Sequence, residues 1–401
     1  MRRAGMALLG VGVAVVVVSI VWMAQVFPSL KKIPADYDQT VDFEGTYSYV
    51  ADGDFFIQAL GNASVRGVLG SPPTLLLLSR PETQQLLASP QLPAVLGDPR
   101  VLAALANPAA AGQIQDPAIL QLIGSAAFQA LVRDANIVKL FTDREGLSAM
   151  LDPRMGRLLR NPANPQMVDL PVAFHRVRTA ERTEGGTLFL HQDFSATTTG
   201  GQPLPQYSST STLAVDRESR EYAAGGSEAR TGRFAFPFDV DQDETYQIWI
   251  TEAGQPLPAK FVREAEVNGL GVLTFQVSEK GLALPDAPKI DAGLPASLSL
   301  IADVEATFQT EEKSGITVKL ESDISYRLAN AALGNPVIFR ARIADTAGSV
   351  QSSVEDARDV KSQLMWLGTV LPWVLIVVAL ALLGGGAMLV ARTSGKDGAK
   401  G

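Results

Sequence analysis

The chain has 401 residues, of which 46% are hydrophobic and 19% are charged, and its formal net charge is −8 at pH 7. The excess of acidic residues argues against nucleic acid as a partner. The chain has no cysteine, so no disulfide can stabilise it. This composition argues against a eukaryotic secreted protein and favours a prokaryotic cell surface.

Two uncharged segments, residues 6–26 and 364–391, are each long enough to cross the roughly 30 Å hydrocarbon core of a bilayer as a helix. The first is longer than the apolar part of a usual signal peptide, and no convincing cleavage site follows it. We therefore expect transmembrane helices at residues 1–27 and 364–392. The small residues that would let these helices pack closely are Gly10, Gly12, Ala14, Gly384, Gly385 and Gly386.

Positive charges lie outside both apolar segments. Arg2 and Arg3 precede the first segment, and Arg392 follows the second. Basic residues accumulate on the cytoplasmic side of membrane helices. We expect both termini to be cytoplasmic, with residues 393–401 as a tail, and the large domain between the helices to lie outside the plasma membrane.

The large domain begins with residues 28–70, where alternating, aromatic-rich stretches at 40–50 and 54–60 predict two strands. Its last part, residues 341–363, has a mildly helical pattern that leads to the second apolar segment.

Residues 167–340 predict a β-rich body. Short turn signals such as Asn268-Gly269 separate successive strands, which is typical of an antiparallel sheet or barrel. The expected strands are 168–178, 187–194, 207–216, 232–238, 246–251, 259–266, 271–278, 297–310 and 316–328.

A nine-residue repeat occupies the insertion at residues 71–166. In each unit a capping residue such as Asp116 precedes a slot often held by proline, such as Pro117, and this pair marks the start of a helix. Apolar residues follow at positions three, six and seven of the unit, so they form one face of a helix barely two turns long. Such short helices are not stable alone, so we expect the units to stack on one another.

The repeat resembles the Asp-Pro-punctuated short helices of stress-inducible-type co-chaperones, which form apolar grooves for hydrophobic segments. The resemblance implies a groove for an acyl chain or an apolar peptide. A self-packed array and a lateral oligomer contact are the alternatives. The candidate groove residues are Leu105, Ile119, Leu122, Phe128, Leu131, Ile137, Leu140 and Phe141.

A second resemblance rests on the segments Arg-Phe-Ala-Phe-Pro-Phe at 233–238, Thr-Tyr-Gln-Ile-Trp at 245–249 and Gly-Leu-Gly-Val-Leu-Thr-Phe at 269–275. They resemble the actinobacterial PorA-type family of two-span surface proteins, which implies a membrane-anchored extracytoplasmic domain. The family name suggests a porin, but two helical spans do not make a transmembrane barrel. The arrangement of anchors, β-rich domain and helical insertion is also similar to class B scavenger receptors, which pass lipid through a tunnel.

No sequence motif predicts catalysis, because phosphate-binding loops, nucleophile elbows and zinc-protease motifs are all missing. We expect no enzyme activity, no cofactor and no metal site. The densest aromatic group packs either as core or as the lining of an apolar cavity. The candidate cavity residues are Phe236, Phe238, Tyr246 and Trp249.

These patterns together predict an α+β protein, with an antiparallel β-rich ectodomain (sheet or barrel), an inserted array of short helices and two flanking transmembrane helices. We expect it to bind or transfer an apolar ligand such as an envelope lipid. The alternative is a structural or interaction scaffold that docks a partner or self-assembles through the helical repeats. The expected partners are the lipid bilayer, a lipid or apolar peptide, and a further copy of the chain or another membrane protein.

Overall fold

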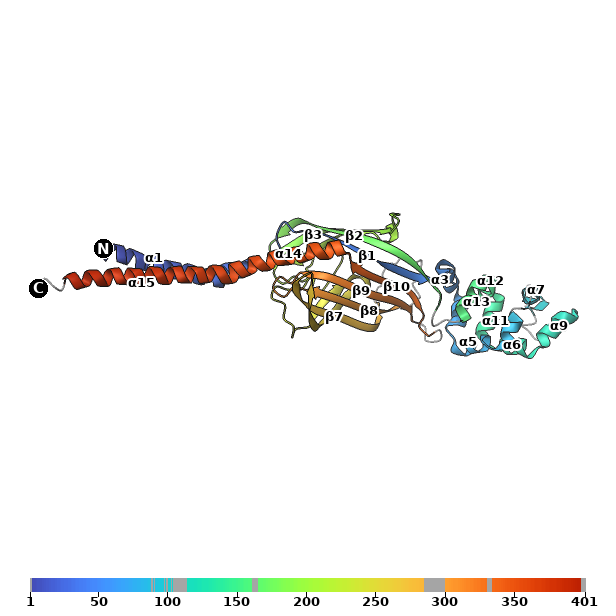
Figure 1. Cartoon of the computed structure of the whole chain (residues 1–401). Coiled ribbons are helices and arrows are strands. Elements are labelled where there is room, and N and C mark those ends of the chain that lie inside the picture. Colours follow the sequence, from blue (N-terminus) through green and yellow to red (C-terminus); the bar gives the residue numbers. More distant parts are fainter. Residues whose placement is uncertain are drawn as a thin grey trace.

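The structure is a computed structural model that describes residues 2–87, 91–96, 114–160, 165–284, 300–329 and 334–397, and positions 89, 98, 100, 101 and 103. Figure 1 shows its parts in line: long terminal helices at one end, a strand domain in the middle, and short helices at the far end. The α+β class expected from the sequence is confirmed by a ten-stranded antiparallel sheet and two long apolar helices.

Both terminal helices are long and apolar enough to cross a membrane, over Met6–Leu30 and Ala347–Ala391. They pack side by side (Figure 1), and Trp22 Nε1 donates a hydrogen bond to the Leu367 carbonyl at 2.9 Å. Of the expected small residues, Gly12 packs directly against Leu383, whereas Gly10, Gly384 and Gly385 have open space where a Cβ would lie. The elements are α1 (Arg2–Val21), η1 (Trp22–Val26), α2 (Phe27–Leu30), α14 (Ala347–Met365), η6 (Trp366–Val370) and α15 (Leu371–Asp397).

The ten strands form one sheet in the order β4-β3-β2-β1-β10-β9-β8-β7-β6-β5, and all neighbouring strands are antiparallel. At the β6–β7 turn, Asn268 and Gly269 both have positive φ, as the Asn-Gly signal predicts. The strands are β1 (Asp38–Val50), β2 (Met167–Glu184), β3 (Thr187–Thr198), β4 (Ser209–Asp216), β5 (Tyr246–Ile250), β6 (Gln255–Val267), β7 (Leu270–Ala283), β8 (Leu300–Thr310), β9 (Thr317–Leu328) and β10 (Val337–Asp345).

The connection between β4 and β5, residues 217–245, closes the sheet. Its Tyr222 bridges to β4, and its Arg233 bridges to both Glu221 and Ile248 of β5. Backbone bonds such as Ala223 N to Ala214 O and Trp249 N to Arg233 O continue this ladder. The edge strands are thereby joined, and the sheet wraps around its own interior.

Three of the expected elements are wrong. Residues 54–60 lie in helix α3 (Gly53–Gly61), because the apolar positions of this segment fit a helical face that packs into the array. Residues 232–238 make only isolated bridges, since Pro237 cannot donate to a ladder. Residues 341–345, expected to be helical, belong to β10, whose alternation of apolar and charged residues has period two.

The short helices lie between β1 and β2, which are neighbours in the sheet, so the array extends from the end of a hairpin (Figure 1). It begins at Gly53 rather than at residue 71. Asn62 and Ser71 cap α4 and α5, so the nine-residue spacing extends upstream of the predicted insertion. The helices are α3, α4 (Ala63–Leu69), α5 (Pro72–Leu78), α6 (Pro81–Leu87), α7 (Leu92–Leu96), α9 (Pro117–Gly124), α10 (Ala126–Leu131), α11 (Ala135–Thr142), α12 (Arg144–Leu151) and α13 (Pro153–Arg160).

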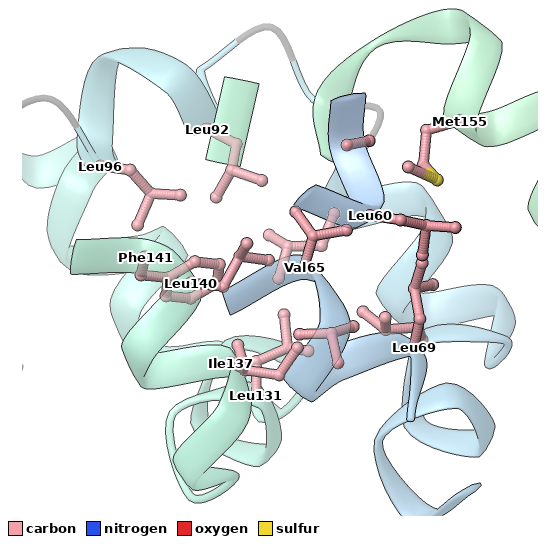
Figure 2. Close-up of a cluster of buried hydrophobic side chains, with 14 of the residues drawn as sticks. Leu60, Val65, Leu69, Leu92, Leu96, Leu131, Ile137, Leu140, Phe141 and Met155 are labelled. Atoms are coloured by element: carbon pink, nitrogen blue, oxygen red, sulfur yellow. The ribbon is translucent and has the colours of Figure 1, made fainter. Parts of the chain in front are cut away.

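The apolar faces of these helices meet in one buried cluster (Figure 2), which also contains Leu300 and Leu328 from the end of the sheet. Capping side chains add contacts between units. Thr74 Oγ1 donates to Asp134 Oδ2 at 2.7 Å, and Asn62 Nδ2 donates to Asp143 at 2.9 Å. The caps Asn62, Asp134 and Asp143 therefore hold both their own helix and a helix distant in sequence.

We expect Leu131→Asp to unfold the array while the sheet keeps its structure. Leu131 is fully buried, and a carboxylate there loses hydration without gaining a partner, at a cost of several kcal/mol. Hydrogen exchange should show lost protection in the helices of residues 53–160 and unchanged protection in β6 to β9. Leu76→Asp, at a side chain 66% exposed, is the control. Loss of protection in both parts would show that they unfold as one unit.

Candidate functional site

A cavity of about 940 Å³ lies inside the curled sheet. Its walls come from the inward faces of β1 to β5 and β8 to β10, from the 217–245 connection and from α14. The lining extends from Tyr47 in β1 to Leu364 and Leu367, close to the start of α15. The cavity is therefore within the size range of small-molecule sites, and its lining extends along α14 to Leu367, just before α15.

Three of the four predicted cavity residues, Phe236, Phe238 and Trp249, line this space. Tyr246 does not, because it is buried in the wall behind Phe236, with ring centroids 5.3 Å apart. Its hydroxyl accepts a hydrogen bond from the Asp241 backbone at 2.7 Å. The aromatic group thus serves both as core and as cavity lining, the two alternatives considered from the sequence.

Strand β2 directs two arginines into the cavity, because Arg176 and Arg178 alternate with the outward-facing His175 and Val177. Arg176 lies over the Phe43 ring at 4.7 Å, and Arg178 lies over the Phe234 ring at 4.6 Å. Arg178 Nε also donates to Gln192 at 2.8 Å. This alternation is visible in the sequence, but the predicted cavity residues were chosen from the aromatic group at 236–249 instead.

A third arginine, Arg220, comes from the connection that closes the sheet. Its backbone has φ of 60°, its guanidinium lies 3.7 Å from the centroid of the Phe238 ring, and it donates to the Phe236 carbonyl at 2.7 Å. Only 7% of the residue is exposed. Burial lowers the pKa of Arg220 to about 10 and that of Arg176 to about 9, so both remain cationic at neutral pH.

The pKa values of carboxyl groups in the cavity wall are also shifted. Burial raises the pKa of Asp345 to about 6, although its Oδ2 accepts a hydrogen bond from the Leu320 backbone at 2.6 Å. Burial raises the pKa of Glu252 as well. On α14, burial and the neighbouring Asp359 raise the pKa of Asp356. Burial therefore raises the pKa of each of these three carboxyl groups, and the charge of Arg176 opposes the rise at Asp345 and Glu252.

The end of the cavity nearest the terminal helices is fixed by an ion pair between α14 and the β8–β9 turn. Lys361 Nζ lies 2.9 Å from Glu311, whose side chain is fully buried and also accepts from the Ser314 backbone at 2.8 Å. Gly315, with φ of 66°, packs against the carbonyls of Phe236 and Pro237 and leaves no room for a Cβ. The turn, the connection and α14 are thus held together.

The predicted groove residues lie elsewhere. They pack within the array: Phe128, Leu131, Ile137, Leu140 and Phe141 are buried in its core, and Leu122 and Ile119 are partly buried against neighbouring clusters. Leu105 lies outside the described residues. The self-packed alternative therefore describes the arrangement of the described helices.

The two histidines lie on the outside of the sheet. His175 Nδ1 is 2.6 Å from Asp42, and His191 lies between Glu181 and Asp193. Within the described part of the chain, no three acidic, histidine or cysteine side chains are grouped to hold a metal ion.

A family model described as Porin PorA matches residues 159–388, more than half of the chain. The matched residues run from the end of the array through the cavity wall, except for β1 and the preceding residues 30–37, and through most of α15. Among curated proteins no relative matches the chain.

We expect Asp345→Asn to stabilise the protein above about pH 6. A carboxyl whose folded pKa of about 6 exceeds its ordinary value of 3.8 favours the unfolded state as pH rises through that window. The stabilisation should be absent below the lower value and reach about 2–3 kcal/mol above the upper one. Thermal unfolding in detergent across pH measures it, with exposed Asp169→Asn as control. A pH-independent difference would contradict the burial of Asp345.

Proposed function

This chain is a member of the PorA family, and from that premise we propose that it is a membrane-anchored protein whose large domain binds or transfers an apolar ligand, such as an envelope lipid, outside the cytoplasm. The observation that carries the proposal is the cavity of about 940 Å³. Aromatic side chains line it, and Leu364 and Leu367 extend its lining close to the start of α15. An acyl chain matches this volume and this chemistry.

The outer surface of the sheet supports a domain that stands outside the bilayer. Charged residues alternate with the cavity-facing residues of β8 to β10 and point outward. They are Glu305, Asp323, Arg340 and Arg342. Asp323 pairs with both arginines. A transmembrane barrel needs an apolar outer band instead. The apolar terminal helices therefore remain the membrane-spanning elements of the proposal.

The proposed topology places both termini in the cytoplasm. Arg2, Arg3 and Arg392 support it, because basic residues accumulate on that side of membrane helices. We also propose a binding protein rather than an enzyme, since the sequence contains none of the common hydrolase or phosphate-binding motifs.

We expect the full-length chain, purified in mild detergent, to carry a lipid that native mass spectrometry and organic extraction detect. Ser322→Trp, on the cavity side of β9, should reduce the bound lipid several-fold because the indole fills the space. The preceding residue, Glu321, points outward, so Glu321→Trp should retain the lipid. Equal lipid in both variants, or none in the wild type, would reject the carrier function.

The exposed leucines of the array support the second candidate, an interaction scaffold. Leu76 is 66% exposed and Leu120 46%, on helices α5 and α9. If the array docks copies of the chain, light scattering in detergent should detect a defined oligomer that Leu76→Glu and Leu120→Glu dissociate. A monomer at all concentrations would exclude self-assembly through these leucines.

A further inference from the structure

We propose that the cavity ligand carries an anionic head group, a carboxylate or a phosphate, held by Arg176, Arg178 and Arg220. This inference rests on the proposed function and narrows it from apolar ligands in general to anionic amphiphiles.

The three arginines line the same cavity, and the charge of each acts on the phenol of Tyr37, which also lies in the lining. Burial raises the pKa of Tyr37, and the charges of Arg178, Arg176 and Arg220 oppose that rise. The phenol itself donates to Gln39 at 2.8 Å. Three cations from two separate segments, β2 and the closing connection, therefore share one neighbourhood.

No described carboxylate contacts these three arginines directly, although Asp345 and Glu252 of the same wall attract Arg176 from a longer distance. Among the described residues, no carboxylate oxygen lies within 4.0 Å of Arg176, Arg178 or Arg220. The fourth cavity arginine differs, because Arg230 pairs with Glu228 at 2.8 Å. Buried charges are usually paired in direct contact, so three arginines without such a contact favour an anion from outside the chain.

Unused hydrogen-bond donors lie in the same wall. The buried Nε atoms of Arg176 and Arg220 and the buried indole nitrogen of Trp249 have no hydrogen-bond partner in the described part of the chain. Carboxylate and phosphate oxygens are the acceptors that guanidinium donors match best, and charged bonds of this kind are the strongest hydrogen bonds in proteins. An anionic head group beside these arginines would therefore balance their charges.

The neighbouring lining suits an acyl chain. On β2 the next inward residue after Arg176 is Phe174, which pairs with Phe43 of β1, and Tyr47 continues the same inner face. The rings of Tyr47 and Phe174 are 5.3 Å apart. The head group would lie at the arginines and the chain along these rings.

The test compares three ligands with the same chain, hexadecanoate, hexadecyl phosphate and methyl hexadecanoate, on delipidated full-length protein in detergent. We expect the wild type to bind at least one anionic ligand about tenfold or more tightly than the neutral ester. The double variant R176Q/R220Q should lose that preference while still binding the ester. Arg342→Gln, an exposed arginine on the outer face, should change nothing.

The outcomes distinguish the anionic head group of the ligand from the carrier function itself. Preference for hexadecanoate alone or for the phosphate alone identifies the head group. Equal binding of all three ligands by the wild type overturns the anionic inference and leaves the carrier function standing, whereas binding of none overturns both. The wild-type comparison decides the question even where the double variant fails to fold.

Discussion

The architecture depends on the pairing of β1 with β2 on one side and with β10 on the other. β1 follows the first apolar helix, and β10 leads directly into α14, so this pairing brings the two ends of the chain to one side of the sheet. The same pairing places the array, inserted between β1 and β2, at the opposite end. One antiparallel strand therefore sets the distance between the membrane helices and the short helices.

Local patterns predicted the elements with strong signals and failed where tertiary contacts decide. The elements were predicted correctly at caps such as Asp116 and Asp134, at the apolar terminal segments and at the Asn268-Gly269 turn. Each of these signals has a local physical cause. Residues 54–60 were misassigned because aromatic content outweighed a helical spacing whose partner surface lies in the array.

Only the aromatic residues of the candidate site were predicted from the sequence. Phe236, Phe238 and Trp249 were identified because an aromatic-rich segment is conspicuous in a sequence. Arg176 and Arg178 sit on a partly exposed strand pattern, and Arg220 lies in a turn, so no local rule places these three in one interior. Their proximity arises from sheet closure, in which Arg233 bridges the connection to β5. Such closure depends on contacts distant in sequence.

The helix that leaves the sheet is continuous over 45 residues, Ala347–Ala391, which at 1.5 Å per residue is about 67 Å. A bilayer core takes about 30 Å of this length, so a substantial part of the helix rises above it beside the cavity. Ser353, Asp356 and Gln363 on this part form one wall of the cavity. Each residue of a helix adds a rotation of about 100°. The number of residues between the cavity and the bilayer therefore sets the direction in which the cavity wall faces relative to the first terminal helix. Inserting one residue above the bilayer would change that facing direction as well as the height of the domain.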